Sequence, residues 1–334
     1  MSHLTLDTRR EKLRLAAPFR ISGHVFEETE VVVATLSDGT HTGRGEGGGV
    51  YYLNDDADNM IADIEAARSG IEAGIDRAAL QDLMPAGGGR NAVDCALWDL
   101  EAKQKGVPAW QLAGIDAPRP VVTTFTLGAD SPEKMAAGAK AYAAARAIKV
   151  KLTGELNLDI ERVRAIRLAR PDVWLGVDAN QGFTLAELGE LAAALDACRV
   201  SLLEQPLARG READLEGFTS PMPVAADESA LTSADVPGLA GRFTVNNIKL
   251  DKCGGLTEAL KIARASREAG LQVMVGNMVG TSLAMAPAFV LAQICDFVDL
   301  DGPTFLAQDR EPSVTYSDGT IWAGDDIWGG PDAP

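Results

Sequence analysis

The sequence predicts an α/β protein in which a TIM-type barrel follows a smaller α+β unit. Its 334 residues, 46% of them hydrophobic, suit one barrel of about 200 to 250 residues with a companion unit. From Val121 onward, short apolar strands alternate with amphipathic helices, whereas the preceding part begins with β-rich runs and continues with helices. We therefore expect two domains.

The first unit is predicted to combine antiparallel strands with helices. A strand is expected over residues 4–15, followed by two β-rich runs on either side of the turn Ser37-Asp38-Gly39. Apolar residues then recur at three- and four-residue spacing, which predicts helices over residues 55–73, 76–83 and 91–105. The glycine run at residues 45–49 leads into a loop rather than a helix, so it does not indicate a dinucleotide site.

The second unit contains eight predicted strands, each ending in polar residues. They begin at residues 121, 147, 174, 201, 223, 245, 272 and 297, and the connecting helices include residues 132–146, 159–169, 185–197 and 256–269. Repeats of roughly 22 to 28 residues indicate parallel strands with right-handed crossovers, for which a barrel is favoured over an open doubly wound sheet. A hairpin around Asp318-Gly319 is expected to pack back on the first unit.

Charge and cysteine usage limit the possible partners. The net charge of −17 argues against nucleic acid and membrane surfaces and leaves a small molecule as the expected ligand. The four cysteines show no CxxC spacing, and we find neither a signal-peptide core nor a long apolar run, so a reduced, cytoplasmic location is expected. All three histidines lie within the first 41 residues, so catalysis in the second unit must use other bases.

Three acidic residues end consecutive predicted strands, namely Asp178, Glu204 and Asp227. In a barrel these side chains converge at the carboxyl ends of the strands, where functional groups collect. Their mutual repulsion calls for a cation, and oxygen ligands suit Mg²⁺. The alternative is that each acid caps a helix or faces solvent.

Lysines lie on two other strands. Lys149 and Lys151 alternate on one face of the second strand, and Lys249 ends the sixth strand, across the barrel mouth. Two lysines on either side of a metal-bound substrate suit proton removal on one face and delivery on the other, with pKa values lowered by the metal, by each other and by burial. The alternative is a solvated basic patch or ion pairs with the three acids.

The eighth strand ends in Asp299 and Asp301, two carboxylates on one face that need a cationic partner. A substrate ammonium group would serve. Lys252 is the alternative partner, and a structural pair bonded to another lysine or arginine is a third interpretation.

Together these motifs resemble a known family. KVK at 149–151, DAN from 178, EQP from 204, ADES around Asp227 and NIKLDKCGG from 247 resemble the muconate-lactonizing branch of the enolase superfamily. DLDGP from 299 and RNAVDCALWDL from 90 are similar to the dipeptide epimerases, including L-Ala-D/L-Glu epimerases.

The resemblance implies a capping domain of residues 1–115, completed by 305–334, over a (β/α)₇β barrel of residues 116–304. It implies one Mg²⁺ per subunit on Asp178, Glu204 and Asp227, with Lys151 and Lys249 as acid/base catalysts, and it suggests a homo-oligomer. Lys149 would contact the substrate carboxylate or enolate oxygen, Asp299 and Asp301 the α-ammonium of a dipeptide, and Thr126 and Asn277 would be further substrate neighbours. The implied reaction is a reversible 1,1-proton transfer, through an enolate, at the α-carbon of the C-terminal residue.

The sequence does not determine which side chains the substrate carries. Family members that act on Ala-Glu often place an arginine in the capping loop, and the segment Arg20 to His24 offers no clear match. Tyr51 and Tyr52 are candidates for the wall of the side-chain pocket.

Several other functions compete with this one. Within the superfamily they are muconate-type cycloisomerisation, o-succinylbenzoate synthesis and N-acylamino acid racemisation, against which Asp299 and Asp301 argue. Outside it they are a Schiff-base aldolase using Lys151 or Lys249, and a non-catalytic binding protein.

Overall fold

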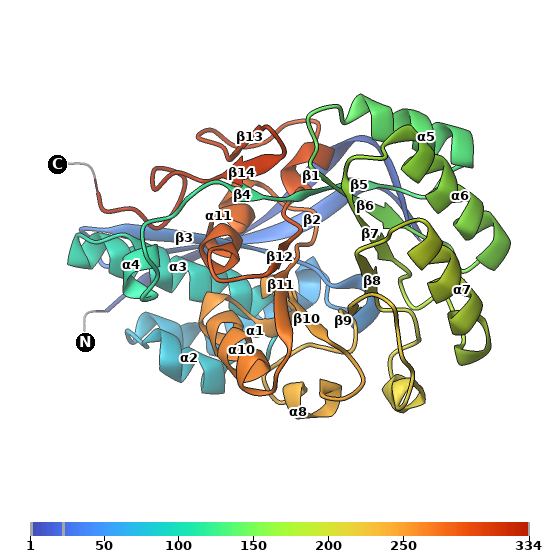
Figure 1. Cartoon of the computed structure of the whole chain (residues 1–334). Helices are drawn as coiled ribbons and strands as arrows, with labels where there is room; N and C mark the ends of the chain where they lie inside the picture. Colours follow the sequence, from blue (N-terminus) through green and yellow to red (C-terminus); the bar gives the residue numbers. More distant parts are fainter. Residues whose placement is uncertain (1–2, 22–23, 333–334) are drawn as a thin grey trace.

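The N-terminal unit is a three-stranded antiparallel sheet covered by helices (Figure 1). The computed structural model describes the backbone of residues 3–21 and 24–332, and the side chains of residues 3–18 and 25–332. The sheet has the order β1-β2-β3, with β1 at Thr5–Ile21, β2 at His24–Ser37 and β3 at Thr42–Gly48. The first strand is thus longer than predicted, with a register shift between Arg14 and Phe19. The side chains of Arg20 and His24, the candidates in the capping loop, lie outside the described residues.

Helix α3 packs directly on this sheet because β3 carries glycines at alternate positions. Cβ atoms added to Gly43, Gly45 and Gly47 would lie 2.0 to 2.2 Å from carbonyl oxygens of α3. These glycines therefore serve helix–sheet packing, a role that the sequence did not indicate. The helices of this unit are α1 (Ala57–Glu72), α2 (Arg77–Leu83), α3 (Gly88–Lys105) and α4 (Ala109–Leu112), with a 3₁₀ turn at Tyr51–Leu53.

The second unit is a nearly closed parallel barrel, which confirms the predicted fold class. All eight predicted strands are present, in the sheet order β12-β11-β10-β9-β8-β7-β6-β5. They are β5 (Thr124–Leu127), β6 (Ala147–Lys151), β7 (Trp174–Asp178), β8 (Leu202–Glu204), β9 (Val224–Ala226), β10 (Val245–Ile248), β11 (Gln272–Val275) and β12 (Phe297–Val298). Every neighbouring pair is parallel. In the part of the chain that the structure describes, no strand ladder joins β12 to β5.

Helices cover the outside of the barrel, more completely over some strands than over others (Figure 1). The long helices are α5 (Pro132–Ala141), α6 (Leu156–Ala169), α7 (Leu185–Ala197), α10 (Leu256–Glu268) and α11 (Ser282–Ala292). After β8 and β9 the connections contain only short turns, η2 (Glu212–Leu215) and α8 (Val236–Leu239). One further short helix, α9 (Leu250–Cys253), follows β10 directly, and η3 (Gly302–Phe305) follows β12.

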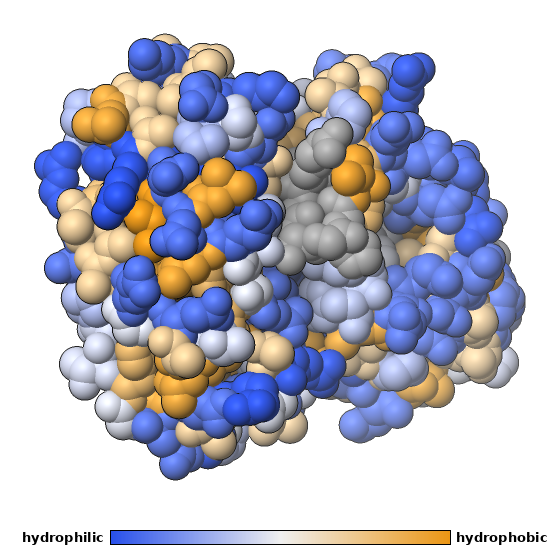
Figure 2. Space-filling view, turned by 90° about the vertical axis from the view of Figure 1, so that its right-hand side faces the viewer, coloured by the Kyte–Doolittle hydropathy of each residue, from blue (hydrophilic) through white to orange (hydrophobic). Residues whose placement is uncertain are grey.

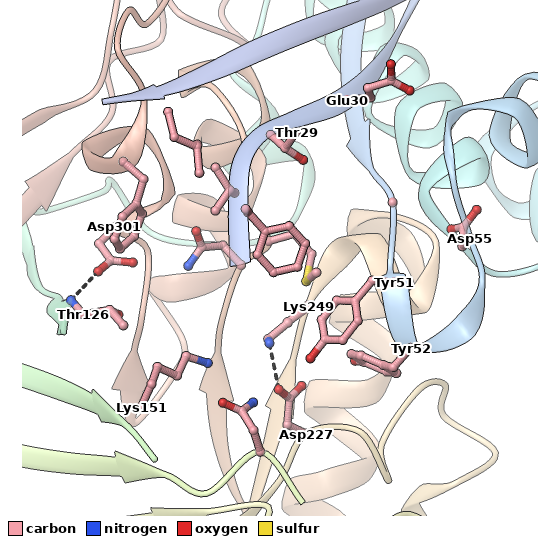
Figure 3. A pocket seen from close by; sticks show the side chains of 18 of the residues that line it. Thr29, Glu30, Tyr51, Tyr52, Asp55, Thr126, Lys151, Asp227, Lys249 and Asp301 are labelled. Atoms are coloured by element: carbon pink, nitrogen blue, oxygen red, sulfur yellow. Dashed lines mark hydrogen bonds and ion pairs between the residues drawn. The ribbon is translucent and has the colours of Figure 1, made fainter. Parts of the chain in front are cut away.

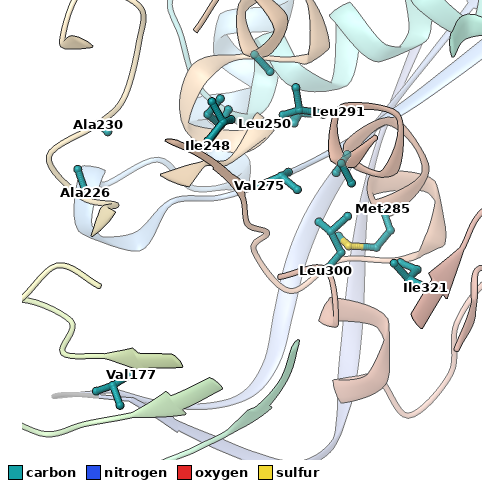
Figure 4. Close-up of a cluster of buried hydrophobic side chains, with 14 of the residues drawn as sticks. Val177, Ala226, Ala230, Ile248, Leu250, Val275, Met285, Leu291, Leu300 and Ile321 are labelled. Atoms are coloured by element: carbon teal, nitrogen blue, oxygen red, sulfur yellow. The ribbon is translucent and has the colours of Figure 1, made fainter. Parts of the chain in front are cut away.

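Alternate strand residues divide between two cores. The outer one lies between strands and helices and includes Val177, Ile248 and Val275 (Figure 4). The inner one fills the base of the barrel with Leu202, Ala225, Val245 and Met274, against which Trp174 and Phe297 pack. Because the interior positions recur every second residue, the polar residues that follow these apolar ones also point into the barrel, at its open end.

The C-terminal segment contacts both units. The hairpin of β13 (Thr315–Ser317) and β14 (Thr320–Trp322) pairs with β4 (Val121–Val122), at the entry to the barrel. Further on, Trp328 Nε1 donates hydrogen bonds to the carbonyls of Arg44 and Cys95 in the first unit. Within the described residues, no helix is long and apolar enough to cross a membrane. Figure 2 shows one face of the molecule, on which hydrophobic groups lie among hydrophilic ones.

Candidate active site

Three carboxylates converge at the barrel mouth, as the sequence predicts. Asp178 and Glu204 are the last residues of β7 and β8, and Asp227 follows β9 directly. The three side chains are at most 1% exposed, and one oxygen of each lies within 4.8 Å of the others, a grouping suited to a metal ion. The alternative in which these acids face solvent is therefore wrong.

A fixed donor holds one oxygen of each carboxylate. The backbone N–H of Asn180 donates to Asp178 Oδ1 over 3.0 Å, Asn247 Nδ2 donates to Glu204 Oε1 over 2.9 Å, and Lys252 Nζ donates to Asp227 Oδ1 over 2.6 Å. Such outer contacts fix the orientation of metal ligands. The second oxygens point toward one another and toward the lysines.

Lysine ammonium groups pair with these second oxygens. Lys151 Nζ lies 2.6 Å from Asp178 Oδ2, Lys249 Nζ lies 2.7 Å from Asp227 Oδ2, and Lys149 Nζ lies 2.8 Å from Glu204 Oε2. These are the ion pairs that the sequence left open as an alternative to catalysis. In this structure the lysines lie next to the carboxylate oxygens that are suited to bind a metal ion.

The electrostatics of the triad favour a bound cation. Burial raises the pKa of Asp178, but Lys151 and Lys149 lower it more, to about 2. Glu204 behaves oppositely: burial and the charge of Asp178 raise its pKa to about 8. The lysines therefore do not neutralise all three carboxylates, and a divalent ion in place of the Glu204 proton fits the donor set.

Lys151 and Lys249 approach the cavity from opposite sides. Figure 3 shows them facing each other across it, Lys151 from the end of β6 and Lys249 from the end of β10. A Cβ on Gly276 would lie 3.1 Å from the Lys249 side chain, so the small residue that follows β11 leaves room for that lysine.

The lowering of the lysine pKa expected from the sequence presupposes a bound metal ion and stays a prediction. Without that ion, burial lowers the pKa of Lys249, but Asp227 and the other carboxylates raise it more, so the net shift is upward. A bound metal ion would compete for these carboxylates. The upward shift of the pKa applies to the Lys249 ammonium while it is paired with Asp227.

Asp299 and Asp301 join the last strand of the barrel to the first. Thr124 Oγ1 donates to Asp299 Oδ1 over 2.5 Å, and the backbone N–H of Thr126 donates to Asp301 Oδ2 over 2.6 Å. The cationic partner of Asp299 is Lys149, at 2.8 Å, rather than Lys252, which is bound to Asp227 instead. Burial and the neighbouring Asp299 raise the pKa of Asp301 to about 7.

Every predicted substrate neighbour lines one cavity of about 330 Å³. Lys149, 3% exposed, reaches it from the barrel floor, while Asn277 lies after β11 and donates from Nδ2 to the carbonyl of Asp299 over 2.6 Å. The cavity is also lined by Lys151, Lys249, Asp227, Thr126, Asp299 and Asp301.

The capping unit supplies the upper wall of the cavity. Tyr51 and Tyr52 line it, as anticipated, and their rings meet edge to face with centroids 5.2 Å apart. Phe26 of β2 contacts Tyr51 in the same way at 5.9 Å, and Glu28 adds an acidic group. Phe26, Glu28, Asn180 and Glu228 were not predicted. Position one or two residues after a ligand residue was the available signal for Glu228 and Asn180, whereas no local pattern marks Phe26.

The RNAVDCALWDL segment fastens the capping unit to the barrel. It lies in α3, where Arg90 donates to the carbonyls of Cys253 and Gly254, and Asn91 Nδ2 donates to Asp251 Oδ1 over 2.8 Å. These partners follow Lys249 directly in the chain, so the motif supports the site without lining it.

Comparison with known proteins gives two family matches that together span most of the chain. Residues 3–114 match the model described as "Mandelate racemase / muconate lactonizing enzyme, N-terminal domain", and residues 134–327 match "Enolase C-terminal domain-like".

Individual relatives agree with these matches. The chain is 39% identical to the L-Ala-D/L-Glu epimerase of Escherichia coli K12, over 95% of this chain and 99% of that one. It is 43% identical to the N-acetyl-D-glutamate racemase of a Pseudoalteromonas species, over 75% and 79% of the two chains. Among solved structures, a dipeptide epimerase from Methylococcus capsulatus complexed with Mg and L-Arg-D-Lys has a TM-score of 0.90 at 29% identity, covering 96% of this chain and 97% of that one.

Proposed function

The chain belongs to the dipeptide epimerases of the mandelate racemase/muconate lactonizing enzyme family, within the enolase superfamily, and we propose that it inverts the α-carbon of a dipeptide's C-terminal residue. The observation that carries this proposal is the pair of lysines facing each other across the cavity, above three buried carboxylates. A pair of identical acid/base groups on opposite faces suits a reversible inversion, because either stereoisomer meets one group that removes a proton and one that returns it.

Asp178, Glu204 and Asp227 would hold Mg²⁺. When bound, that ion supplies positive charge that stabilises the developing enolate and so acidifies the α-proton. One of Lys151 and Lys249 takes the proton from its face of the substrate, and the other delivers a proton to the opposite face. Lys149, buried beside Glu204 and Asp299, is placed to stabilise negative charge on a substrate oxygen.

Asp301 is our candidate for the substrate's α-ammonium. Among the described residues it forms no ion pair with a side chain, whereas Asp299 is already paired with Lys149. Thr126 and Asn277, which bond to this acidic pair, would shape the same end of the cavity. We also propose the domain division at residues 115/116 and 304/305 and assembly into a homo-oligomer.

The test is a panel of L,L-dipeptides in D₂O with Mg²⁺, followed by NMR and mass spectrometry. We expect deuterium at the α-carbon of the C-terminal residue and appearance of the epimer. If no dipeptide of a broad panel exchanges while the protein is folded and binds Mg²⁺, the epimerase proposal is wrong.

Racemisation of an N-acylamino acid is the second candidate. It is favoured by the pairing of Asp299 with Lys149, which uses one of the two carboxylates expected for an ammonium group, and by the similarity to an N-acetyl-D-glutamate racemase. N-acetyl-L- and N-acetyl-D-glutamate belong in the same panel, and faster exchange of these than of any dipeptide would favour this reaction.

A further inference from the structure

Two polar residues that the proposed reaction leaves unused stand beside the carboxylate triad. Glu228 directly follows Asp227, and Asn180 comes two residues after Asp178. Both line the cavity. Within the described part of the chain, Glu228 Oε2 and Asn180 Oδ1 are buried and have no hydrogen-bond partner.

The backbone holds these two side chains in a definite arrangement. Asn180 adopts φ +43°, in the left-handed region that asparagine tolerates better than most residues other than glycine. In that conformation its N–H binds Asp178 Oδ1 and its Nδ2 lies 3.5 Å from Glu228 Oε1. Glu228 is only 1% exposed. The pair is therefore a formed element of the site rather than a surface feature.

Asn180 Oδ1 is an acceptor, and so is Glu228 Oε2 when this carboxyl is ionised, so an occupant that donates hydrogen bonds satisfies both atoms. A buried acceptor without a partner is destabilising, and a buried carboxylate more so. A ligand with two hydrogens and a small volume would satisfy both oxygens, and a water molecule has this chemistry. Magnesium sites with few protein ligands keep several waters.

We propose that Glu228 and Asn180 accept hydrogen bonds from a water molecule carried by the cation that Asp178, Glu204 and Asp227 bind. Both are then positioning residues for the metal's hydration shell and leave the proton transfers to the lysines. Glu228 is absent from the group of oxygens that lie within 4.8 Å of one another, which is why we assign it to the water and not to the metal. The inference rests on the metal site of the proposed function.

Calorimetric titration with Mg²⁺ alone tests the proposal without any substrate. Glu228→Ala removes the acceptor, and we expect the Kd for Mg²⁺ to rise about 10- to 100-fold, the usual effect of losing an outer contact. Glu228→Gln keeps an acceptor oxygen and should weaken binding less. Glu212→Gln is the matched control, because Glu212 bonds to neighbouring Ser229 outside the cavity, and it should leave the Kd unchanged.

Oxygen-17 NMR relaxation with Mn²⁺ in place of Mg²⁺ separates a held water from a simple charge effect. We expect exchange of the Mn²⁺-bound water to be at least about tenfold faster in Glu228→Ala than in the unaltered protein. Equal weakening by Gln and Ala with unchanged water exchange overturns the proposal, as does an unaltered Kd in Glu228→Ala. A protein that binds Mg²⁺ in this way yet epimerises no substrate would contradict the proposed function alone.

Discussion

The barrel mouth has two acidic regions that use the same residue types differently. On the side of β7 to β9, three carboxylates receive lysine and amide donors from inside the barrel, and Glu204 still lacks full compensation. At the seam between β12 and β5, Asp299 and Asp301 receive donors from the first strand. The first region is an incomplete ion-binding site, whereas the second also holds the barrel together.

The largest effect is expected from the lysines that serve the first region. Lys151→Ala or Lys249→Ala should lower the epimerisation rate by about 10²- to 10⁴-fold, the usual contribution of a general acid or base. Each variant keeps one lysine and should still exchange the α-proton of a single stereoisomer in D₂O, measured by NMR. Loss of exchange with both isomers in both variants would contradict the assignment of one lysine to each face.

The next largest effect separates metal binding from folding. Burial and the charge of Asp178 raise the pKa of Glu204, so replacing this carboxyl by a neutral amide costs little stability before a metal binds. Glu204→Gln should therefore leave the Tm of the metal-free protein within a few degrees of the original. It should also abolish the rise in Tm on adding Mg²⁺. In the unaltered protein, Mg²⁺ at 100 times its Kd should add about 2.7 kcal/mol to the free energy of unfolding. A metal-free variant that is strongly destabilised would contradict this account.

A smaller effect, dependent on pH, is expected at the seam. Asp301 has a pKa raised to about 7, so its charged form, which binds an ammonium group, increases as pH rises through 7. The KM for a dipeptide should fall over that interval. In Asp301→Asn the KM should be higher and no longer change near pH 7. Steady-state kinetics from pH 6 to 8 check this, with an N-acetylated substrate as the control that should show no such trend.

The smallest effect is expected from the hydrogen bonds that join β12 to β5. Thr124→Val removes the hydroxyl that binds Asp299 and should lower the free energy of unfolding by about 1 kcal/mol in urea. Thr124→Ser is the matched control, because serine keeps the hydroxyl that donates to Asp299. Equal losses in the two variants would mean that the hydroxyl bond adds nothing specific to the seam.

The sequence predicts the first region well and the second only in part. Asp178, Glu204 and Lys249 come at the ends of regular apolar strands, and a barrel brings all strand ends of one kind together, so periodicity alone places them. The two partners of Asp299, Thr124 and Lys149, lie 175 and 150 residues earlier in the chain, which no local pattern reveals. The same holds for Phe26, whose place in the cavity depends on how the capping sheet sits over the barrel.

The sequence predicts the topology of the barrel but not the pairing of its buried charges. The eight strands follow from the alternation of strands and helices, whereas the carboxylate that each lysine pairs with is left open. Which partner a buried charge meets depends on distances of a few ångströms. Strand order does not supply those distances.

The fastening of α3 couples the two units mechanically. Its backbone lies against the glycines of β3, and its Arg90 and Asn91 hold the segment that begins two residues after Lys249. A rotation of the cap as a whole would pull on the end of β10 and displace a catalytic candidate. The capping unit thus helps to position Lys249. Substitutions on α3, far from the cavity, are therefore able to alter the alignment of that base.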